Sequence, residues 1–204
     1  NPAQRHLRFF FGLGAAGLAS TAALNVLVNP WRVLPEKTEI KALDPYRDVD
    51  AEIRTCKAGL AMRGPWEILV IGSSRPGTGM NPDGPAFSGR PTVNLGMNGG
   101  DLYETRAMLD HALTRQSPKL AILTVDPGDL TRPGKIQIEN DFEFSPLSKG
   151  DPVERSLRYV FSQMSVDASM AALKLLATKG KPAYGQKGLQ HREAARLNFF
   201  ETME

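Results

Sequence analysis

The sequence contains few residues that could cross-link the chain or hold a metal. Cys56 is its single cysteine, which excludes an internal disulfide bond. Its three histidines, His6, His111 and His191, lie far apart in the chain, and with one cysteine they are too few ligands for a structural zinc site. We therefore expect neither a metal nor a cofactor.

The sequence also lacks a segment in which charges of one sign are concentrated. The 25 Lys and Arg residues and the 22 Asp and Glu residues are spread along the chain, and the formal net charge is +3. No basic stripe with interleaved aromatic residues occurs, which argues against a nucleic-acid partner. With 41% hydrophobic and 23% charged residues, the composition is that of a folded protein, and 204 residues suffice for one domain with an appendage.

One long hydrophobic run is present near the start of the chain. Residues 9–28 (FFFGLGAAGLASTAALNVLV) carry no charged side chain. At about 1.5 Å per residue such a helix is about 30 Å long, which is the thickness of the hydrocarbon core of a bilayer. Trp31 and Arg32 follow the run and suit an interfacial anchor. A cleaved signal peptide is the alternative, but signal cores are usually about 7–15 residues long, so we favour a retained anchor.

The run also contains a face of small residues that another membrane helix could approach closely. The residues of this face are Gly12, Ala16 and Ser20, flanked by Gly17 and Thr21. Asn25 adds a polar group that would prefer a partner inside the membrane. We therefore expect contacts with the bilayer and with other integral membrane subunits. Basic residues stand on both sides of the run, so charge alone does not fix its orientation.

The remainder of the chain is typical of an α/β protein. Three short apolar runs at 67–71, 92–95 and 120–125 predict strands buried on both faces of a parallel sheet. Between the second and third, Asp101 caps a predicted helix that ends near Gln116, which completes a βαβ unit. Further helices are predicted at 151–164 and 165–180, and a short one at 50–63.

The first predicted strand runs into the turn GSSRPGTG, which begins at Gly72. A phosphate-binding P-loop would need Lys where Thr78 stands, and Pro76 removes a backbone donor, so nucleotide binding is not expected. The nucleophile elbow G-x-S-x-G matches Gly72 and Ser74 but has Pro76 in place of its second glycine.

A third template fits this turn better. The segment ILVIGSSR (68–75), followed by VNLGMNGGDLYE (93–104), resembles the SGNH (GDSL-type) hydrolase superfamily, and most closely its membrane-anchored bacterial envelope branch. The resemblance covers residues 25–130. It implies a flavodoxin-like α/β fold, Ser74 as the nucleophile, and the backbone N–H groups of Ser74 and Gly99 as oxyanion donors.

Two parts of the family's site are not found in the sequence. The block that supplies the third oxyanion donor, an Asn, reads TVDPGDL, with Asp126 at the strand end. The family's late D-x-x-H supplies the base that a serine needs, but the only late histidine, His191, is preceded at that spacing by Gly188. His191 is therefore a weak candidate base. The chain starts at Asn1 rather than Met, and we expect it to belong to a longer product, which could supply the missing groups.

Simpler roles are open for the same residues. Ser73 and Ser74 could cap backbone groups at the turn. Arg75 could pair with Asp101 or Asp126 and lock one loop to another. Gly99 could serve only the geometry of its turn.

These observations predict four segments: a transmembrane anchor at 1–31, a connector at 32–65, an SGNH-like α/β domain at 66–180 and an irregular tail at 181–204. We expect a single-pass protein of the bacterial inner membrane with its globular part in the periplasm. Two functions remain open. The first is a non-catalytic accessory subunit of a membrane complex, and the second is a membrane-tethered serine esterase or acyltransferase acting on envelope glycans. The missing Asn and D-x-x-H favour the first.

Overall fold

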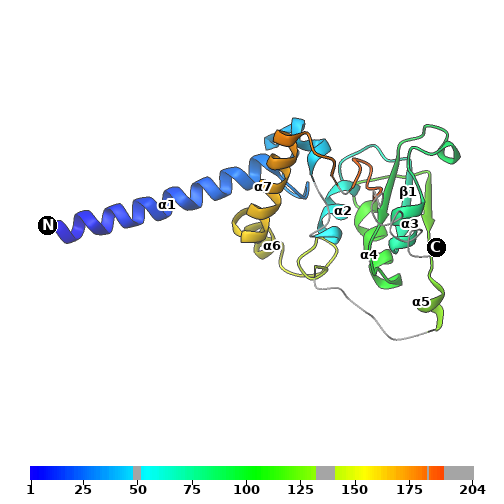
Figure 1. Ribbon diagram of the computed structural model, residues 1–204. Coiled ribbons are helices and arrows are strands. Elements are labelled where there is room, and N and C mark those ends of the chain that lie inside the picture. The colour runs from blue at the N-terminus through cyan, green and yellow to red at the C-terminus, as the bar shows by residue number, and fades with distance from the viewer. Residues whose placement is uncertain (48–51, 132–140, 183, 191–204) are drawn as a thin grey trace, which may run out of the picture.

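The chain folds into a body of helices around a small sheet, from which one long helix projects (Figure 1). The computed structural model describes residues 1–47, 52–131, 141–182 and 184–190. The helices are α1 (Pro2–Val28), α2 (Ile53–Ala61), α3 (Ser74–Gly79), α4 (Leu102–Leu113), α5 (Pro127–Thr131), α6 (Pro152–Phe161) and α7 (Gln163–Thr178), with 3-10 turns η1 (Glu36–Thr38), η2 (Lys41–Tyr46) and η3 (Pro85–Phe87). The strands are β1 (Ile68–Gly72), β2 (Thr92–Gly96) and β3 (Leu120–Leu123).

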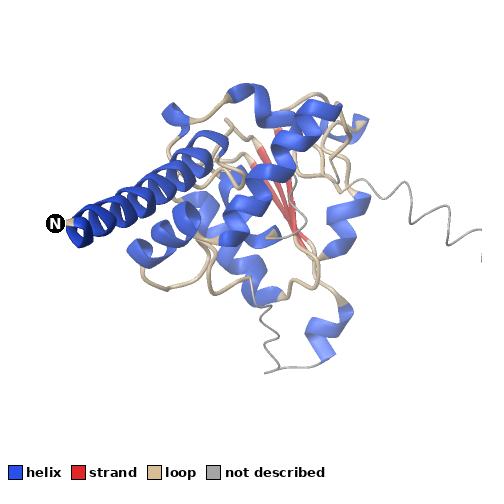
Figure 2. Cartoon of the chain, turned by 60° about the vertical axis from the view of Figure 1, so that its left-hand side comes forward, coloured by secondary structure: helices blue, strands red, loops and turns tan. Residues whose placement is uncertain are grey.

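All three strands run parallel, in the order β2-β1-β3. Ile68 is paired with Thr92 on one side and with Leu120 on the other, so the strands start at the same edge of the sheet and end at the same edge. β1 and β2 are completely buried, as their continuous apolar runs predicted. The predicted α/β class, with a parallel sheet flanked by helices and preceded by one apolar helix, is confirmed (Figure 2).

The segment predicted as a connector, 32–65, belongs to the body. All nine residues of α2 are buried, and its Ala58 and Leu60 share one core cluster with Leu69 of β1 and Met108 of α4. The prediction was misled by the charged residues of this stretch, several of which, including Arg54 and Lys57, are buried inside the protein instead of facing water. The division expected at residue 65 therefore does not separate two units in the structure.

The base of α1 is packed into the body by α6 and α7. The Asn25 amide, which is fully buried, donates to the Val160 carbonyl at 2.8 Å and accepts from the Ser169 hydroxyl at 2.8 Å. The partner that Asn25 requires is therefore provided by this chain's own helices. Residues 1–20 of α1 are exposed along their whole length.

Trp31 and Arg32 do not act as the predicted interfacial anchor. Trp31 is 3% exposed and packs edge-on against Tyr159 of α6, with ring centroids 5.8 Å apart. Arg32 is 7% exposed and donates to the Asp44 carbonyl at 2.9 Å. The chain turns back into the body directly after α1, so both side chains are enclosed by the core.

The two edges of the sheet differ. The turn formed by residues 184–190, closed by a bridge between Tyr184 and Gln190, covers the edge of β2, where the Lys187 carbonyl accepts from Asn94 N at 2.8 Å. At the opposite edge, Leu120 and Leu123 of β3 are 42% and 46% exposed. This contradicts the expectation that the third strand is buried on both faces.

Arg54 and Glu104 join α2 to α4 through a buried ion pair. Arg54 Nε and Nη2 donate to the two carboxylate oxygens of Glu104 at 2.8 and 2.7 Å, and both side chains are almost completely buried. Arg54 also pairs with Asp141 at 3.0 Å and donates to the Asn98 carbonyl.

We expect Arg54→Met to lower the free energy of unfolding by about 3–5 kcal/mol, because the Glu104 carboxylate would stay buried without its cation. Thermal melts of the detergent-solubilised chain would measure this. The matched control is Arg106→Met, which removes an exposed pair with Asp110 on the same α4 and should cost at most about 1 kcal/mol. Equal losses for the two variants would contradict the role assigned to Arg54.

Candidate functional site at the carboxyl edge of the sheet

The carboxyl ends of the three strands are tied together by short polar contacts. The Gly72 carbonyl at the end of β1 accepts from Met97 N after β2 at 2.8 Å, and the Ile71 carbonyl accepts from Thr124 N after β3 at 2.9 Å. Arg75 pairs with Asp126 at 2.8 Å, which decides between the two partners that the sequence left open for it. Ligands of open α/β sheets gather at this edge, so it is the first place to look for a site.

Two glycines permit the close approach of these turns. Gly72 has φ +153°, and a Cβ there would lie 1.9 Å from Thr124 Oγ1. A Cβ on Gly96 would lie 2.6 Å from Gly77 N, so only glycine lets α3 lie directly on the end of β2. Any larger residue at either position would push the turn that carries Ser74 away from its neighbours.

Ser73 and Ser74 have different roles in this turn. Ser73 is the N-cap of α3, and its hydroxyl accepts from Arg75 N at 3.3 Å. Ser74 is the first residue of α3 and is half-buried. Among the described residues, no histidine or carboxylate hydrogen-bonds to the Ser74 hydroxyl. The capping role proposed for both serines therefore belongs to Ser73, and Ser74 lies at the edge without a base from the described part of the chain.

Gly99 lies in the turn that follows β2, at the same edge as Ser74. Its φ is +67°, so the conformation of the turn requires glycine whether or not its N–H binds a ligand. The preceding Asn98 is held by Arg54, which donates to its carbonyl at 3.1 Å. The turn that contains Gly99 is thus bonded to Arg54, which also forms the buried ion pair between α2 and α4.

The histidines do not complete a catalytic group in the described residues. His111 lies on α4 with Nε2 3.3 Å from the Ala58 carbonyl of α2, and burial lowers its pKa against the opposing effect of this hydrogen bond. It serves the packing of two helices. His191, the weak candidate base, lies outside the described residues.

Asn94 is a structural residue of the site that the sequence reasoning missed. It is fully buried in β2, and its amide donates to the carbonyls of Pro76 and Met80 at 2.6 and 2.8 Å, while its Oδ1 accepts from Gly96 N at 3.0 Å. These bonds hold the middle and the C-terminal end of α3. The signal in the sequence was a single polar residue inside the apolar run TVNL.

Lys57 was missed as well, because it stood in the supposed connector. It is 0% exposed, and its ammonium donates to the carbonyls of Asn94 and Gly188 and lies 5.3 Å from the centre of the Tyr184 ring. No carboxylate of the described residues pairs with it. Burial lowers the pKa of Lys57 to about 7. The residue attaches the 184–190 turn to the sheet.

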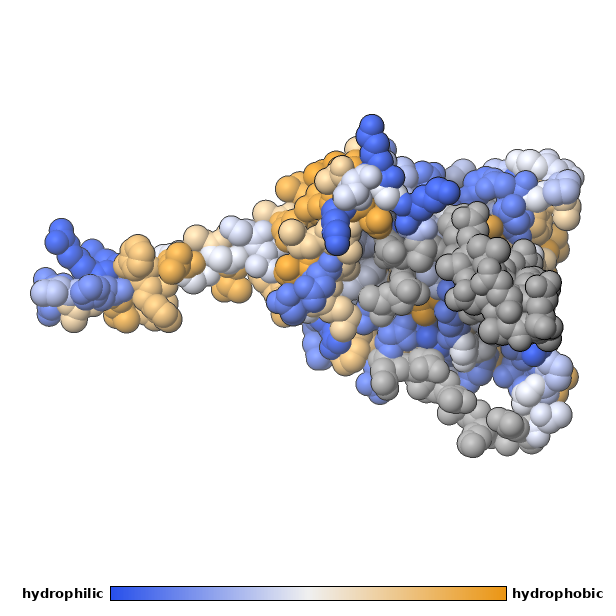
Figure 3. Space-filling model, viewed as in Figure 1, coloured by the Kyte–Doolittle hydropathy of each residue, from blue (hydrophilic) through white to orange (hydrophobic). Residues whose placement is uncertain are grey.

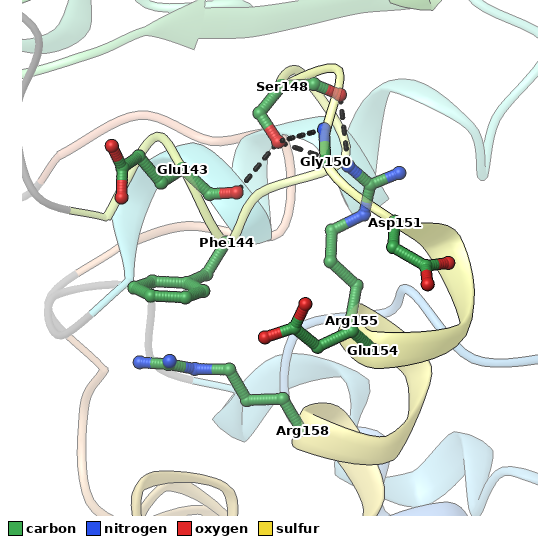
Figure 4. Close-up of a pocket in the computed structure, with 8 residues that line it drawn as sticks. All are labelled: Glu143, Phe144, Ser148, Gly150, Asp151, Glu154, Arg155 and Arg158. Carbon is green, nitrogen blue, oxygen red and sulfur yellow. Dashed lines mark hydrogen bonds between the residues drawn. The ribbon is translucent and has the colours of Figure 1, made fainter.

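A hollow with a volume of about 390 Å³ lies beside α6, away from the carboxyl edge of the sheet (Figure 4). Arg158 lies over the Phe144 ring, 3.3 Å from its centre, and Arg155 donates to the Ser148 carbonyl at 2.9 Å. Its charged lining is mixed, because acidic side chains surround the two arginines: Glu143, Asp151 and Glu154. The mixture selects neither an anion nor a cation.

The face of small residues on α1 remains open. Gly12, Ala16, Gly17 and Ser20 are exposed, and no atom lies within 4 Å of a Cβ placed on Gly12 or Gly17. Thr21 is half-buried where α1 enters the body. Of the residues that were expected to face a membrane partner, Asn25 alone is fully buried within the chain.

Comparison with known proteins does not assign the chain to a family. No family model, no curated protein and no solved structure matches it. The resemblance to SGNH hydrolases therefore rests on the sequence motifs at 68–75 and 93–104.

The buried Lys57 predicts a specific dependence of stability on pH. The folded state holds the lysine proton only below about pH 7, whereas the unfolded chain holds it up to about pH 10.4. Between these values the unfolded state binds more protons, so stability should rise with pH by at most about 1.4 kcal/mol per pH unit.

Melting curves at pH 7.5 and 9.5 would measure this rise, and Lys57→Met should lose it. Lys119→Met, which removes a lysine whose side chain is 71% exposed, should keep it. A rise that is the same in Lys57→Met and in the unmodified chain would show that Lys57 is not its source.

Proposed function

We propose that the chain is a single-pass protein of the bacterial inner membrane whose SGNH-like domain lies in the periplasm and serves as a non-catalytic accessory subunit of a membrane complex. Support for the membrane assignment comes from α1, the one helix among the described residues that is long and apolar enough to cross a bilayer. Its exposed length beyond the body contains the open face of small residues, which suits a neighbouring helix.

The observation that carries the non-catalytic proposal is the arrangement around Ser74. By the resemblance, Asp126 stands in the block where the family has its oxyanion Asn, and it is paired with Arg75. A carboxylate would repel an oxyanion there and could not act as its donor. The Ser74 hydroxyl has no base among the described residues. A serine without a base is a weak nucleophile. In this proposal the residues at the carboxyl edge of the sheet stabilise the fold and do not catalyse a reaction.

An esterase or acyltransferase of envelope glycans is the second candidate. The position of Ser74 favours it, because this residue follows β1 at the start of a helix and its turn is tied to the turn of Gly99 by the bond between the Gly72 carbonyl and Met97 N. This function would need a histidine supplied by residues outside the described ranges.

A serine-directed fluorophosphonate probe distinguishes the two functions. We expect the purified full chain to remain unlabelled under conditions that label an active SGNH hydrolase, because no base activates Ser74. Labelling that disappears in Ser74→Ala and persists in Ser73→Ala would overturn the non-catalytic proposal and establish Ser74 as a nucleophile.

The proposed membrane partner is tested by co-purification in mild detergent. Gly12→Leu combined with Ala16→Leu fills the open face, so we expect the larger assembly to be lost. Gly14→Leu is the matched control, because residue 14 lies about 200° around the helix from residue 12 and also has open space around it. Assembly that is unaffected by the double variant, or a chain that is monomeric from the start, would contradict the accessory role.

A further inference from the structure

The exposed part of α1 is too short to cross a bilayer without the body approaching the membrane. The uncharged stretch begins at residue 9, and the helix is free of the body only up to residue 20. At about 1.5 Å per residue, residues 9–20 span about 18 Å, whereas the hydrocarbon core measures about 30 Å. The remaining length lies in residues 21–28, which pack on one side against α6 and α7.

Residues 21–28 are joined to α6 and α7 by hydrogen bonds and by apolar packing. Asn25 is bonded to Val160 of α6 and to Ser169 of α7, and Val28 shares a core cluster with Ala172 of α7. If the whole uncharged stretch is immersed, α6 and α7 lie at the depth of its last turns. Their outward side chains would then meet lipid and should be apolar.

The outward face of α6 meets this requirement. Val153, Leu157 and Phe161 follow one another at intervals of four residues and are 66%, 55% and 44% exposed. The charged residues of α6, Glu154, Arg155 and Arg158, line the hollow beside Phe144 (Figure 4). Such a division between an apolar and a charged face is typical of helices that lie in a membrane interface.

Apolar side chains are exposed on the neighbouring helices too. Met170 of α7 is 54% exposed and Leu27 of α1 is 46% exposed. Figure 3 shows orange residues, with blue ones among them, on the part of the body where α1 enters it, and further orange residues along α1. The surface is therefore an extension of the helix that is proposed to be in the membrane.

We propose that α6 and α7 form a collar around α1 that is immersed in the membrane interface, with Val153, Leu157, Phe161 and Met170 in contact with lipid. The inference rests on the proposed membrane anchor. It adds a fixed orientation: the body is held against the bilayer and cannot swing freely on a flexible stalk. The carboxyl edge of the sheet is thereby held at one distance from the membrane.

Fluorescence of single-cysteine variants labelled with the probe NBD tests the collar. The full chain is reconstituted into vesicles of phosphatidylethanolamine and phosphatidylglycerol, with or without lipids that carry a quenching doxyl group. The variants are Leu157→Cys on the collar, Leu13→Cys in the anchor and Arg106→Cys on α4, far from both. The unmodified chain, whose Cys56 is 1% exposed, gives the background of labelling.

We expect the labels at positions 157 and 13 to emit at shorter wavelength and to be quenched by doxyl lipid, and the label at 106 to do neither. Quenching at 13 with a water-like signal at 157 would overturn the collar and leave the anchor standing. A label at 157 that is shielded from water but not quenched would also overturn it, because a protein and not lipid would cover this face. An unquenched label at position 13 would refute the anchor itself, and the collar with it.

Phe161→Cys repeats the measurement at a second position of the same stripe. Each labelled variant is accepted only if its melting curve matches that of the unmodified chain, so that loss of structure cannot imitate exposure to water.

Discussion

The burial of α2 depends on neutralising the charge of Arg54. Taking a guanidinium out of water costs several kcal/mol unless a carboxylate and further acceptors surround it. Glu104 supplies a two-point contact, and Asp141 and the Asn98 carbonyl take the remaining donors. Through these bonds one side chain connects α2, α4 and the turn after β2. The core cluster between the sheet and both helices can form because this charge is satisfied.

Buried polar side chains that bond to backbone carbonyls also fix the carboxyl edge of the sheet. Asn94 holds the middle and the C-terminal end of α3, and Lys57 attaches the 184–190 turn to β2. Both side chains donate to backbone carbonyls. Within the described residues, no histidine or carboxylate is bonded to Ser74. The described polar groups at this edge are therefore engaged in holding the turns in place.

The anchor and the body are also one structure. Asn25 is bonded to both α6 and α7, so the helix that is apolar enough to cross a membrane continues into the core without a linker. An amide in an apolar helix needs partners, and here the body supplies them. The orientation of the body relative to α1 is consequently fixed by buried hydrogen bonds, which a flexible tether would not provide.

The sequence by itself determined the elements whose signal is local. Three continuous apolar runs marked the strands, the cap at Asp101 marked the start of α4, and the uncharged run marked α1. Tertiary structure alone decided where the charged residues went. The stretch that contains Arg54 and Lys57 was predicted as a connector, because charged residues are usually exposed, and Trp31 was predicted as an anchor because it follows an apolar helix. Their burial depends on partners more than 30 residues away, such as Glu104, Gly188 and Tyr159, and no local pattern encodes such distant contacts.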